Sequence, residues 1–241
     1  MNDPRALIAL LWAEAVVPKR GPRPTMTLEG IAQVGIELAD GEGLAAVTMQ
    51  RVADCLGVTK MALYRYVPGK AELVAVMIDF GVGTPPRLPA KGRTWRIALI
   101  AWSRALFQRF CQHPWAFAAT LGARVLGPNE LLWVEYAVAA LEEAPLDGAE
   151  KLDVVVTLLG HIRNVAQQLS AIRREPPEHA AQTKLTALVQ GREAQFPALT
   201  AALASEGKST SRGRALDFGV QLILDGVAAL IATRGERSGE L

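Results

Sequence analysis

The side chains best suited to contact another molecule lie within residues 56–70, LGVTKMALYRYVPGK. This stretch carries Lys60, Arg65 and Lys70 together with two tyrosines, and it contains no acidic residue. A helix that enters the major groove of DNA needs side chains long enough to reach base edges, and cations or hydroxyls that hold phosphates. The stretch therefore predicts a DNA-reading helix.

The threonines around this stretch predict the helices that position it. Threonine is a favoured N-cap, because its side-chain oxygen accepts a hydrogen bond from a free backbone amide at the helix start. Gly57 suits a tight turn between two of these helices, and helices joined in this way form a helix-turn-helix reader. The predicted pairs of cap and helix are Thr27 with 28–39, Thr48 with 49–56 and Thr59 with 60–66, followed by a helix over 70–80.

The distribution of charge favours the same interpretation. A net charge of +2 is too small by itself to indicate a nucleic-acid partner. However, the segments 18–24 and 58–70 together hold six bases and no acid. The alternative is a solvated helix face with both tyrosines packed into the core. The caps, the glycine turn and the segregated charge together favour DNA.

The rest of the chain is also expected to be helical. No strand-like alternation persists, and Gly and Pro separate segments of helical length, so the predicted fold class is all-α. The Pro- and Gly-rich segment 81–92 is the natural boundary, although the helix over 70–80 could bridge both halves. The further helices are predicted near 93–112, 115–124, 128–143, 147–172, 180–204 with a break at Pro197, and 212–233.

This pattern predicts three parts. Residues 1–24 form a basic N-terminal arm, residues 25–71 a helix-turn-helix DNA-binding domain, and residues 72–241 a C-terminal helical bundle for ligand binding and dimerisation. Arg20 and Arg23, next to prolines that favour extended backbone, could follow a minor groove or the DNA backbone. A solvated tail without DNA contacts is the equal alternative for this arm.

Composition argues against several other classes of protein. The longest apolar run contains Asp217 and Asp225 and falls short of the roughly 18 residues that a membrane span needs, so a soluble, cytoplasmic protein is expected. Cys55 and Cys111 are far apart in sequence and predict buried thiols rather than a disulfide framework. The histidines lack the spacing of metal ligands, so neither a metal nor a cofactor is expected.

An enzyme is a remote alternative. His113, His161, Glu135 or Asp153 could act as an acid or base, but the sequence offers no paired nucleophile and base, phosphate loop or metal cluster. We therefore expect a DNA-binding protein without catalytic residues.

The N-terminal part resembles the DNA-binding domain of the TetR family of transcriptional regulators. The resemblance covers the first helix, TMQRVADCLGV for the second, TKMALYRYV for the third and GKAEL for the start of the fourth. It implies two groups of DNA contacts. Residues that would face bases or the deep groove are Gln50, Lys60, Met61, Ala62 and Tyr66, and residues that would touch phosphates are Thr27, Thr48, Thr59, Tyr64 and Lys70.

The C-terminal part resembles the tetracycline-repressor branch of this family through HPW, GPNELLWVEYAVAAL and LLGHIRNVAQQL. The resemblance implies a drug pocket walled by aromatic and aliphatic groups, which suits an apolar or aromatic molecule. Trp102 and Ala139 stand where tetracycline-binding members present amides, so tetracycline itself is not expected. Core packing of the stripe on 93–112 is the alternative. The predicted ligand-binding residues are Trp102, Leu106, Phe110, Glu135, Tyr136, Ala139, Val156, Thr157 and Asn164.

The last helix predicts a homodimer. Its apolar residues, among them Leu216, Val220 and Leu222, occupy nearly the whole circumference, so the helix must be buried on two sides. One side can serve its own core and the other a partner copy, with 147–172 as its neighbour. By resemblance the protein is a repressor that binds a palindromic operator and is released by a small molecule. An activator or a reader without a ligand is the alternative.

Overall fold

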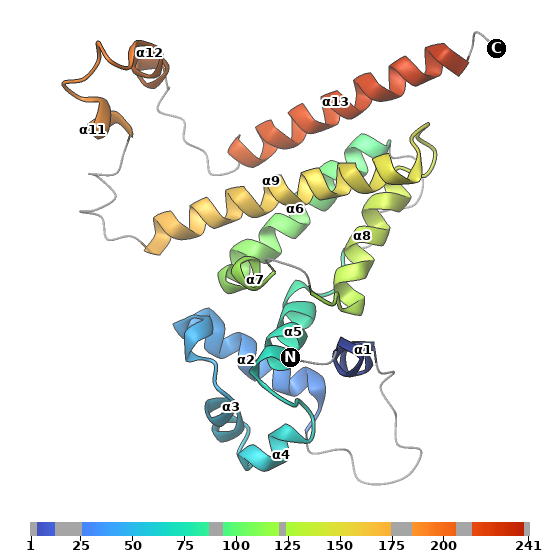
Figure 1. Cartoon of the computed structure of the whole chain (residues 1–241), viewed down its shortest axis with the longest axis vertical. Helices are drawn as coiled ribbons and strands as arrows, with labels where there is room; N and C mark the ends of the chain where they lie inside the picture. Colours follow the sequence, from blue (N-terminus) through green and yellow to red (C-terminus); the bar gives the residue numbers. More distant parts are fainter. Residues whose placement is uncertain are drawn as a thin grey trace.

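The computed structural model of the chain describes residues 4–12, 26–86, 94–120, 124–174, 185–205 and 214–238. Every element within these residues is helical, which confirms the all-α prediction (Figure 1). The elements are α1 (Pro4–Trp12), α2 (Leu28–Glu42), η1 (Leu44–Ala46), α3 (Met49–Cys55), α4 (Lys60–Tyr64), α5 (Lys70–Val82), α6 (Trp95–Gln112), α7 (Pro114–Ala119), α8 (Pro128–Ala140), α9 (Gly148–Arg174), α11 (Leu185–Val189), α12 (Pro197–Ser205) and α13 (Arg214–Ser238).

The predicted caps of the N-terminal part are confirmed. The hydroxyls of Thr27, Thr48 and Thr59 each accept a hydrogen bond from the backbone amide three residues further on, at 3.0, 3.2 and 3.2 Å. Gly57 has a φ of 66° between α3 and α4, a left-handed conformation that glycine adopts without steric cost. These local features fix α4 relative to α3 and produce the helix-turn-helix.

The N-terminal segment contains a helix that the sequence analysis did not predict. In α1, Leu11 is buried in a small apolar cluster with Ala32 of α2 and Val76 of α5. The indole N–H of Trp12 donates to the carbonyl of Leu126, 3.1 Å away. Residues 4–12 are therefore packed rather than extended. Arg20 and Arg23, on which the predicted DNA-contacting arm depends, lie outside the described residues.

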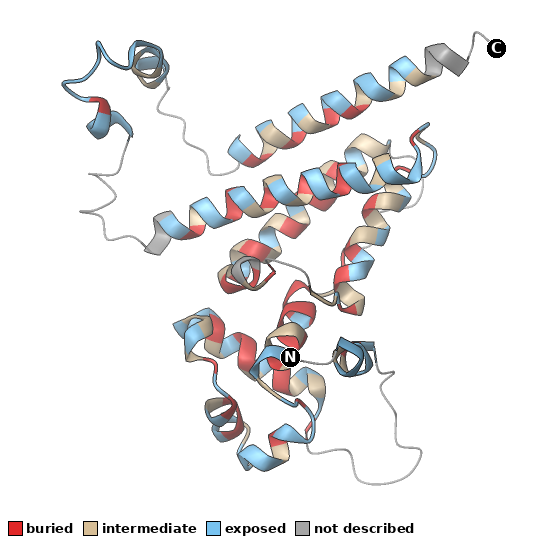
Figure 2. Cartoon of the chain, viewed as in Figure 1, coloured by how far each residue is buried: buried red, intermediate tan, exposed pale blue. Residues whose placement is uncertain are grey.

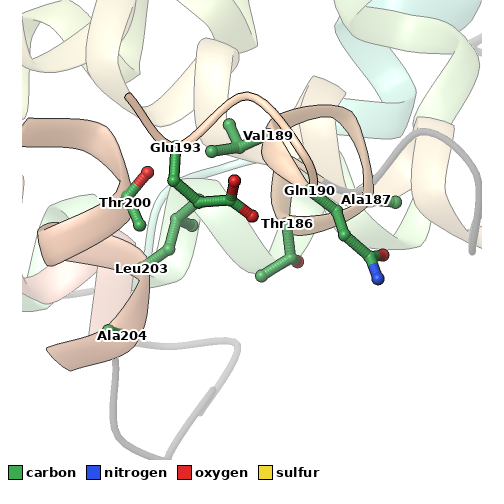
Figure 3. Close-up of a pocket in the computed structure, with 8 residues that line it drawn as sticks. All are labelled: Thr186, Ala187, Val189, Gln190, Glu193, Thr200, Leu203 and Ala204. Carbon is green, nitrogen blue, oxygen red and sulfur yellow. The ribbon is translucent and has the colours of Figure 1, made fainter. Parts of the chain in front are cut away.

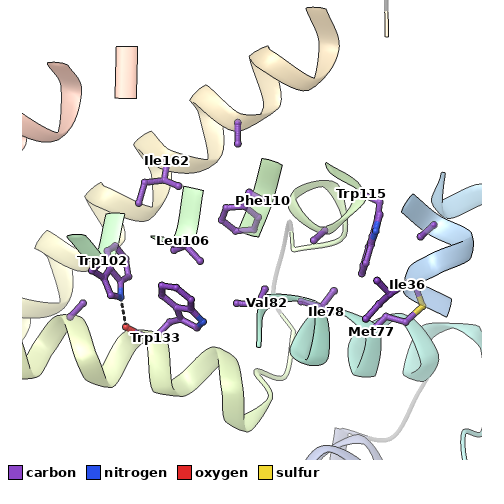
Figure 4. Close-up of a cluster of buried hydrophobic side chains, with 14 of the residues drawn as sticks. Ile36, Met77, Ile78, Val82, Trp102, Leu106, Phe110, Trp115, Trp133 and Ile162 are labelled. Atoms are coloured by element: carbon purple, nitrogen blue, oxygen red, sulfur yellow. Dashed lines mark hydrogen bonds between the residues drawn. The ribbon is translucent and has the colours of Figure 1, made fainter. Parts of the chain in front are cut away.

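Helix α5 joins the two halves of the molecule. Leu73 and Met77 pack with residues of α2, and Ile78 and Val82 continue the same buried cluster toward Trp102 and the other large side chains of the C-terminal half (Figure 4). One apolar core thus runs from α2 through α5 into the bundle. Buried residues on both sides of the boundary expected at 81–92 belong to the same core.

In the C-terminal half, α6 packs against α8, α9 and α13, and α9 packs against α8 and α13 as well (Figure 1). Buried residues face the inside of this bundle, whereas α11 and α12 are mostly exposed and lie apart from it (Figure 2). The prediction for 180–204 was wrong in one detail. Pro197 begins α12 instead of breaking a helix, because proline suits the first turn, and Gly191 with φ 78° interrupts the chain earlier.

Helix α13 is long and apolar enough to cross a membrane, judged by its length and composition alone. Its buried side nevertheless packs Leu216, Val220 and Leu224 into the common core. Its acids pair with α6: Arg96 binds Asp225 at 2.7 Å, and Arg104 binds Asp217 at 2.9 Å. These contacts explain its composition as that of a core helix with a second, exposed apolar side.

Candidate functional site

The surface of α4 presents the side chains predicted to read DNA. Leu63 is fully buried and anchors the helix on the core. On the other side, Met61 is 74% exposed, and Tyr64 and Tyr66 are 36% and 38% exposed. The alternative in which both tyrosines pack into the core is therefore wrong. Lys60 is also exposed, and its ammonium lies 5.8 Å from the centre of the Tyr64 ring.

The remaining predicted DNA contacts surround α4. Gln50, Thr48, Thr59 and Thr27 are exposed, whereas Ala62 is half-buried. The amide of Gln50 donates to the carboxylate of Asp54 at 2.8 Å, so it would have to exchange this partner for a base. Ala62 lies within α4, whereas the other four lie at helix starts or on α3, and the contacts of all five with DNA stay a prediction.

Lys70 is less isolated than its position at a helix start suggested. Its ammonium donates to the carbonyl of Leu44 at 3.5 Å, and this acceptor partly offsets the unfavourable helix dipole. A cation at this helix start is therefore accounted for without a phosphate, and the phosphate contact of Lys70 stays a prediction. The side chain is still exposed and can reach outward.

The charges near α4 favour an anionic partner. Within the described part of the chain, no carboxylate lies within ion-pair distance of Lys60, Arg65 or Lys70. The neighbouring acid Glu42 is held by Arg51 at 2.6 Å, and this hydrogen bond lowers the pKa of Glu42. The cations of this surface are therefore not neutralised by ion pairs with described carboxylates.

Two polar contacts connect the α4-bearing half to the bundle, and neither was predicted from the sequence. In the first, the carboxylate of Asp40 at the end of α2 accepts hydrogen bonds from His113 Nδ1 at 3.0 Å and from Trp115 Nε1 at 2.7 Å. His113 thus has a structural partner rather than a free ring. The HPW motif ties the end of α6 and the start of α7 to α2.

In the second contact, Asp79 of α5 caps the start of α8. Its carboxylate accepts from the backbone amide of Glu130 at 3.1 Å and from the side-chain amide of Asn129 at 3.0 Å. Gly127 lies so close that an added Cβ would be 2.2 Å from Asp79 Oδ1. A lone acid inside the apolar run LVAVMIDFGV was the sequence signal for this cap. It fixes α8 relative to α5.

Burial of Asp79 raises the pKa of its carboxyl above the ordinary value of 3.8, although hydrogen bonds from Glu130 and Asn129 act in the opposite sense. The folded state therefore keeps this proton at a pH where the unfolded chain has lost it. The stability that results is fully present below pH 3.8 and is lost as the pH rises through the folded-state pKa.

We expect Asp79→Asn to flatten this part of the stability profile, because asparagine does not titrate. Urea denaturation at closely spaced pH values from about 3.5 upward measures the slope, which one proton limits to about 1.4 kcal/mol per pH unit. The exposed Asp153→Asn is the matched control and should keep the wild-type profile. An unchanged slope in Asp79→Asn would contradict the assignment.

The nine predicted ligand-binding residues differ in how far they are buried. Trp102, Leu106 and Phe110 are buried in the core of α6, and the Trp102 indole donates to the carbonyl of Trp133 at 2.8 Å. Tyr136 is half-buried against the core. The exposed members are Glu135, Ala139, Val156, Thr157 and Asn164.

Helical geometry explains why some of these residues are buried and others exposed. On α8, Trp133 and Ala137 face the core, and Glu135 lies about 200° around the helix from Trp133. On α9, Val155 and Leu158 are buried, so that Val156 between them points outward. The core-packing alternative accounts for the α6 stripe, and a single pocket lined by all nine residues stays a prediction.

Two hollows lie elsewhere. One of about 500 Å³ lies between α11 and α12, where Glu193, Thr200 and Leu203 converge (Figure 3). The other, of about 380 Å³, lies between α9 and α13 and includes Thr157, Leu222 and Gly226. Of the nine predicted residues, Thr157 alone lines either hollow.

His161 has a structural role as well. Its Nε2 lies 3.1 Å from the carbonyl of Leu216, and it donates there because the carbonyl can only accept. An added Cβ on Gly219 would lie 2.2 Å from the His161 ring, so the glycine allows α13 to approach α9 closely. Within the described residues, no group of three or more His, Cys, Asp or Glu side chains could hold a metal ion.

Comparison with known proteins covers both halves of the chain. Residues 31–77 match the description "Bacterial regulatory proteins, tetR family", and residues 88–231 match "Tetracyclin repressor-like, C-terminal domain". The HTH-type transcriptional repressor DrrR1 of Streptomyces coeruleorubidus is 34% identical, over 97% of this chain and 88% of that protein. An HTH-type transcriptional regulator of Saccharopolyspora erythraea is 28% identical, over 86% of each chain.

Solved structures share the fold. ActR of Streptomyces coelicolor, in complex with actinorhodin, superposes with a TM-score of 0.73 at 22% identity, over 86% of this chain and 97% of that one. A possible TetR family transcriptional regulator from Streptomyces coelicolor A3(2) superposes with a TM-score of 0.67 at 23% identity, over 85% and 100%. The arrangement of helices is therefore shared with these proteins.

Proposed function

Because the chain belongs to the TetR family of bacterial transcriptional regulators, we propose that it represses transcription by binding a palindromic operator as a homodimer. We further propose that a small, largely apolar or aromatic molecule binds its C-terminal domain and releases it from DNA. The protein is a DNA-binding regulator with a ligand-binding domain rather than an enzyme.

The observation that carries the DNA-binding proposal is the exposure of side chains on α4. Thr59 caps this helix, and Leu63 anchors its other side in the core. Lys60, Met61 and Tyr66 would face bases, because they are exposed and long enough to cross the groove. Tyr64 and Lys70 would hold phosphates. This division assigns sequence preference to the first group and overall affinity to the second.

A second copy of the chain would cover the exposed apolar side of α13. Phe218 is 66% exposed, Leu222 57%, and on the neighbouring α9 Val156 is 65% exposed. An added Cβ on Gly226 or on Gly160 would meet no atom within 4 Å, which leaves space for close approach of a partner helix. A two-fold dimer of this kind places its two α4 helices in half-sites about 34 Å apart.

Release by a ligand requires that the bundle and α4 move together. Asp40 links α2 to α7, and Asp79 links α5 to α8. A shift of α7 would therefore act on α2, and a shift of α8 would act on α5. Both α2 and α5 belong to the half of the molecule that carries α4. Such coupling is reciprocal. A ligand that weakens operator binding tenfold itself binds about 1.4 kcal/mol less well to the DNA-bound form.

The names of two similar proteins support repression and the binding of a small molecule. DrrR1 is named a transcriptional repressor, and ActR is described in complex with actinorhodin. We propose an apolar or aromatic ligand because Trp, Leu, Phe and Tyr dominate the α6 and α8 residues assigned to binding. The alternative is an activator or a regulator without a ligand. The burial of Trp102 and Leu106 in the core favours that version for the α6 part of the site.

The division of labour on α4 gives a direct test. Lys60→Ala should relax base preference at one position of the half-site, by about 1–3 kcal/mol of discrimination. Lys70→Ala should weaken binding to all sequences alike and reduce the salt slope by about 1. Fluorescence anisotropy with fragments of its own promoter and single-base variants, at several salt concentrations, measures both quantities.

Arg192→Ala is the matched control, because Arg192 is an exposed cation between α11 and α12, away from the reader. It should leave affinity and preference unchanged. If Lys60→Ala lowers affinity uniformly without relaxing specificity, the base-reading role of Lys60 is wrong. If the wild-type protein does not bind its own promoter region, the repressor proposal fails.

A further inference from the structure

Arg163 of α9 carries a buried donor that has no acceptor. Its Nε is inaccessible to solvent and has no hydrogen-bond partner among the described residues. The residue as a whole is only half-buried, so part of the guanidinium can still meet a molecule that binds from outside. An unsatisfied buried donor on a charged group is costly and needs an explanation.

The carboxylate of Glu130 does not supply the missing acceptor for Arg163 Nε. Glu130 is the carboxylate that attracts Arg163, but both of its oxygens are already engaged by Arg124 in a bidentate ion pair. One of them, Oε2, also accepts from the amide of Gly127 at 3.1 Å. Glu130 therefore already accepts three hydrogen bonds, none of them from Arg163, and the Nε of Arg163 is left without an acceptor.

The electrostatics of Arg163 agree with this geometry. Burial lowers the pKa of its guanidinium, and the positive charge of Arg124 lowers it further, whereas Glu130 acts in the opposite sense. The cation is therefore penalised as it stands. A second anion would relieve the penalty, and a planar carboxylate matches the fork of donors on arginine.

We propose that Arg163 and Arg124 form a subsite for a carboxylate group on the ligand of the C-terminal domain. This proposal rests on the proposed ligand-dependent function and specifies the ligand as an acid with an aromatic or apolar body. The subsite lies at the start of α8. There, the carboxylate of Glu130 accepts hydrogen bonds from Arg124, and the backbone amide of Glu130 donates a hydrogen bond to Asp79.

The position of the subsite suggests how it acts. A bound carboxylate competes with Glu130 for Arg124 and so changes the contacts at the first turn of α8. Asp79, which caps that turn, belongs to α5, and α5 continues into the reading half. The charged group of the ligand would therefore act directly on the helix that joins the two halves.

The test compares an acid with its neutral counterpart. Thermal unfolding of the full-length protein is measured with 2-naphthoate and with 2-naphthamide at constant ionic strength. We expect 2-naphthoate to raise the unfolding temperature of the wild type more than 2-naphthamide does, because ligands of the native state stabilise it. Arg163→Met should weaken 2-naphthoate about tenfold or more without affecting 2-naphthamide, and Arg163→Lys should lose less.

Arg104→Met is the matched control, because this exposed arginine pairs with Asp217 away from the subsite. It should retain the wild-type preference for the acid. Equal stabilisation by the two compounds, no stabilisation by either, or an unchanged preference in Arg163→Met would each overturn the subsite. Promoter binding is measured on the same samples. If DNA binding persists without an acid preference, this proposal fails alone, whereas loss of DNA binding would count against the proposed repressor.

Discussion

Gly127→Ala is expected to destabilise the protein by about 3–5 kcal/mol, because overpacking would combine with loss of the Asp79 cap. The added Cβ would lie 2.2 Å from Asp79 Oδ1 and 2.3 Å from its Cγ. Neither atom can withdraw without releasing the amide of Glu130, to which Asp79 is bonded. Thermal unfolding should therefore show a decrease of about 6–20 °C for a chain of this size.

Gly41→Ala is the control for this substitution. Gly41 lies in α2, and an added Cβ would meet nothing within 4 Å, so the change should be neutral or stabilise by up to about 1 kcal/mol. If Gly127→Ala unfolds at the same temperature as Gly41→Ala, then the contact between α5 and α8 is looser than the structure indicates.

Leu222→Glu is expected to abolish the homodimer and with it most operator affinity. Leu222 lies on the exposed apolar side of α13, where the two-fold contact would oppose two introduced carboxylates in a dry interface. A separated protomer reads a single half-site and loses the avidity of the pair, which is about 10²–10⁴-fold. Sedimentation velocity should show half the wild-type mass, and anisotropy with promoter DNA the loss of affinity.

The control is Leu131→Glu, which places the same charge on an exposed leucine of α8. It should remain dimeric and bind DNA like the wild type. A Leu222→Glu protein that stays dimeric would refute the assignment of α13 to the interface. A monomer that keeps full operator affinity would refute the need for two readers.

These expected effects lie at different points of one connected structure. Gly127 and Asp79 determine how α8 sits on α5, and Asp40 determines how α2 sits on α7. The reading helix α4 touches neither contact directly. Helix α4 packs on α3, α3 packs on α2, and α2 packs on α5, so changes in the bundle can reach DNA without altering any residue of α4.

The N-terminal helices could be predicted because their signals are local. Thr27, Thr48 and Thr59 cap helices through amides three residues away, and Gly57 needs only its own conformation to make the turn. The exposure of the polar and aromatic side chains of α4 belongs to the same local pattern, because Leu63 faces the core and its neighbours point outward. The family resemblance was confirmed for both halves of the chain.

The grouping of the ligand-binding residues could not be predicted in the same way. Whether Trp102 lines a pocket or fills the core depends on how α6 meets α8, and the indole of Trp102 is bonded to the backbone of α8. Pro197 shows a similar limit at a smaller scale. Proline can end one helix or begin the next, and here it begins α12.

By itself, the sequence determined the all-α class, the capped helix-turn-helix and the chemical character of α4, because helix periodicity, caps and turns act within a few residues. Only the tertiary structure decided the pairing of Asp40 with His113, the cap that Asp79 places on α8, and the unsatisfied donor of Arg163. Each of these depends on side chains separated by tens of residues, whose distance is set by packing of the whole core and by no local pattern.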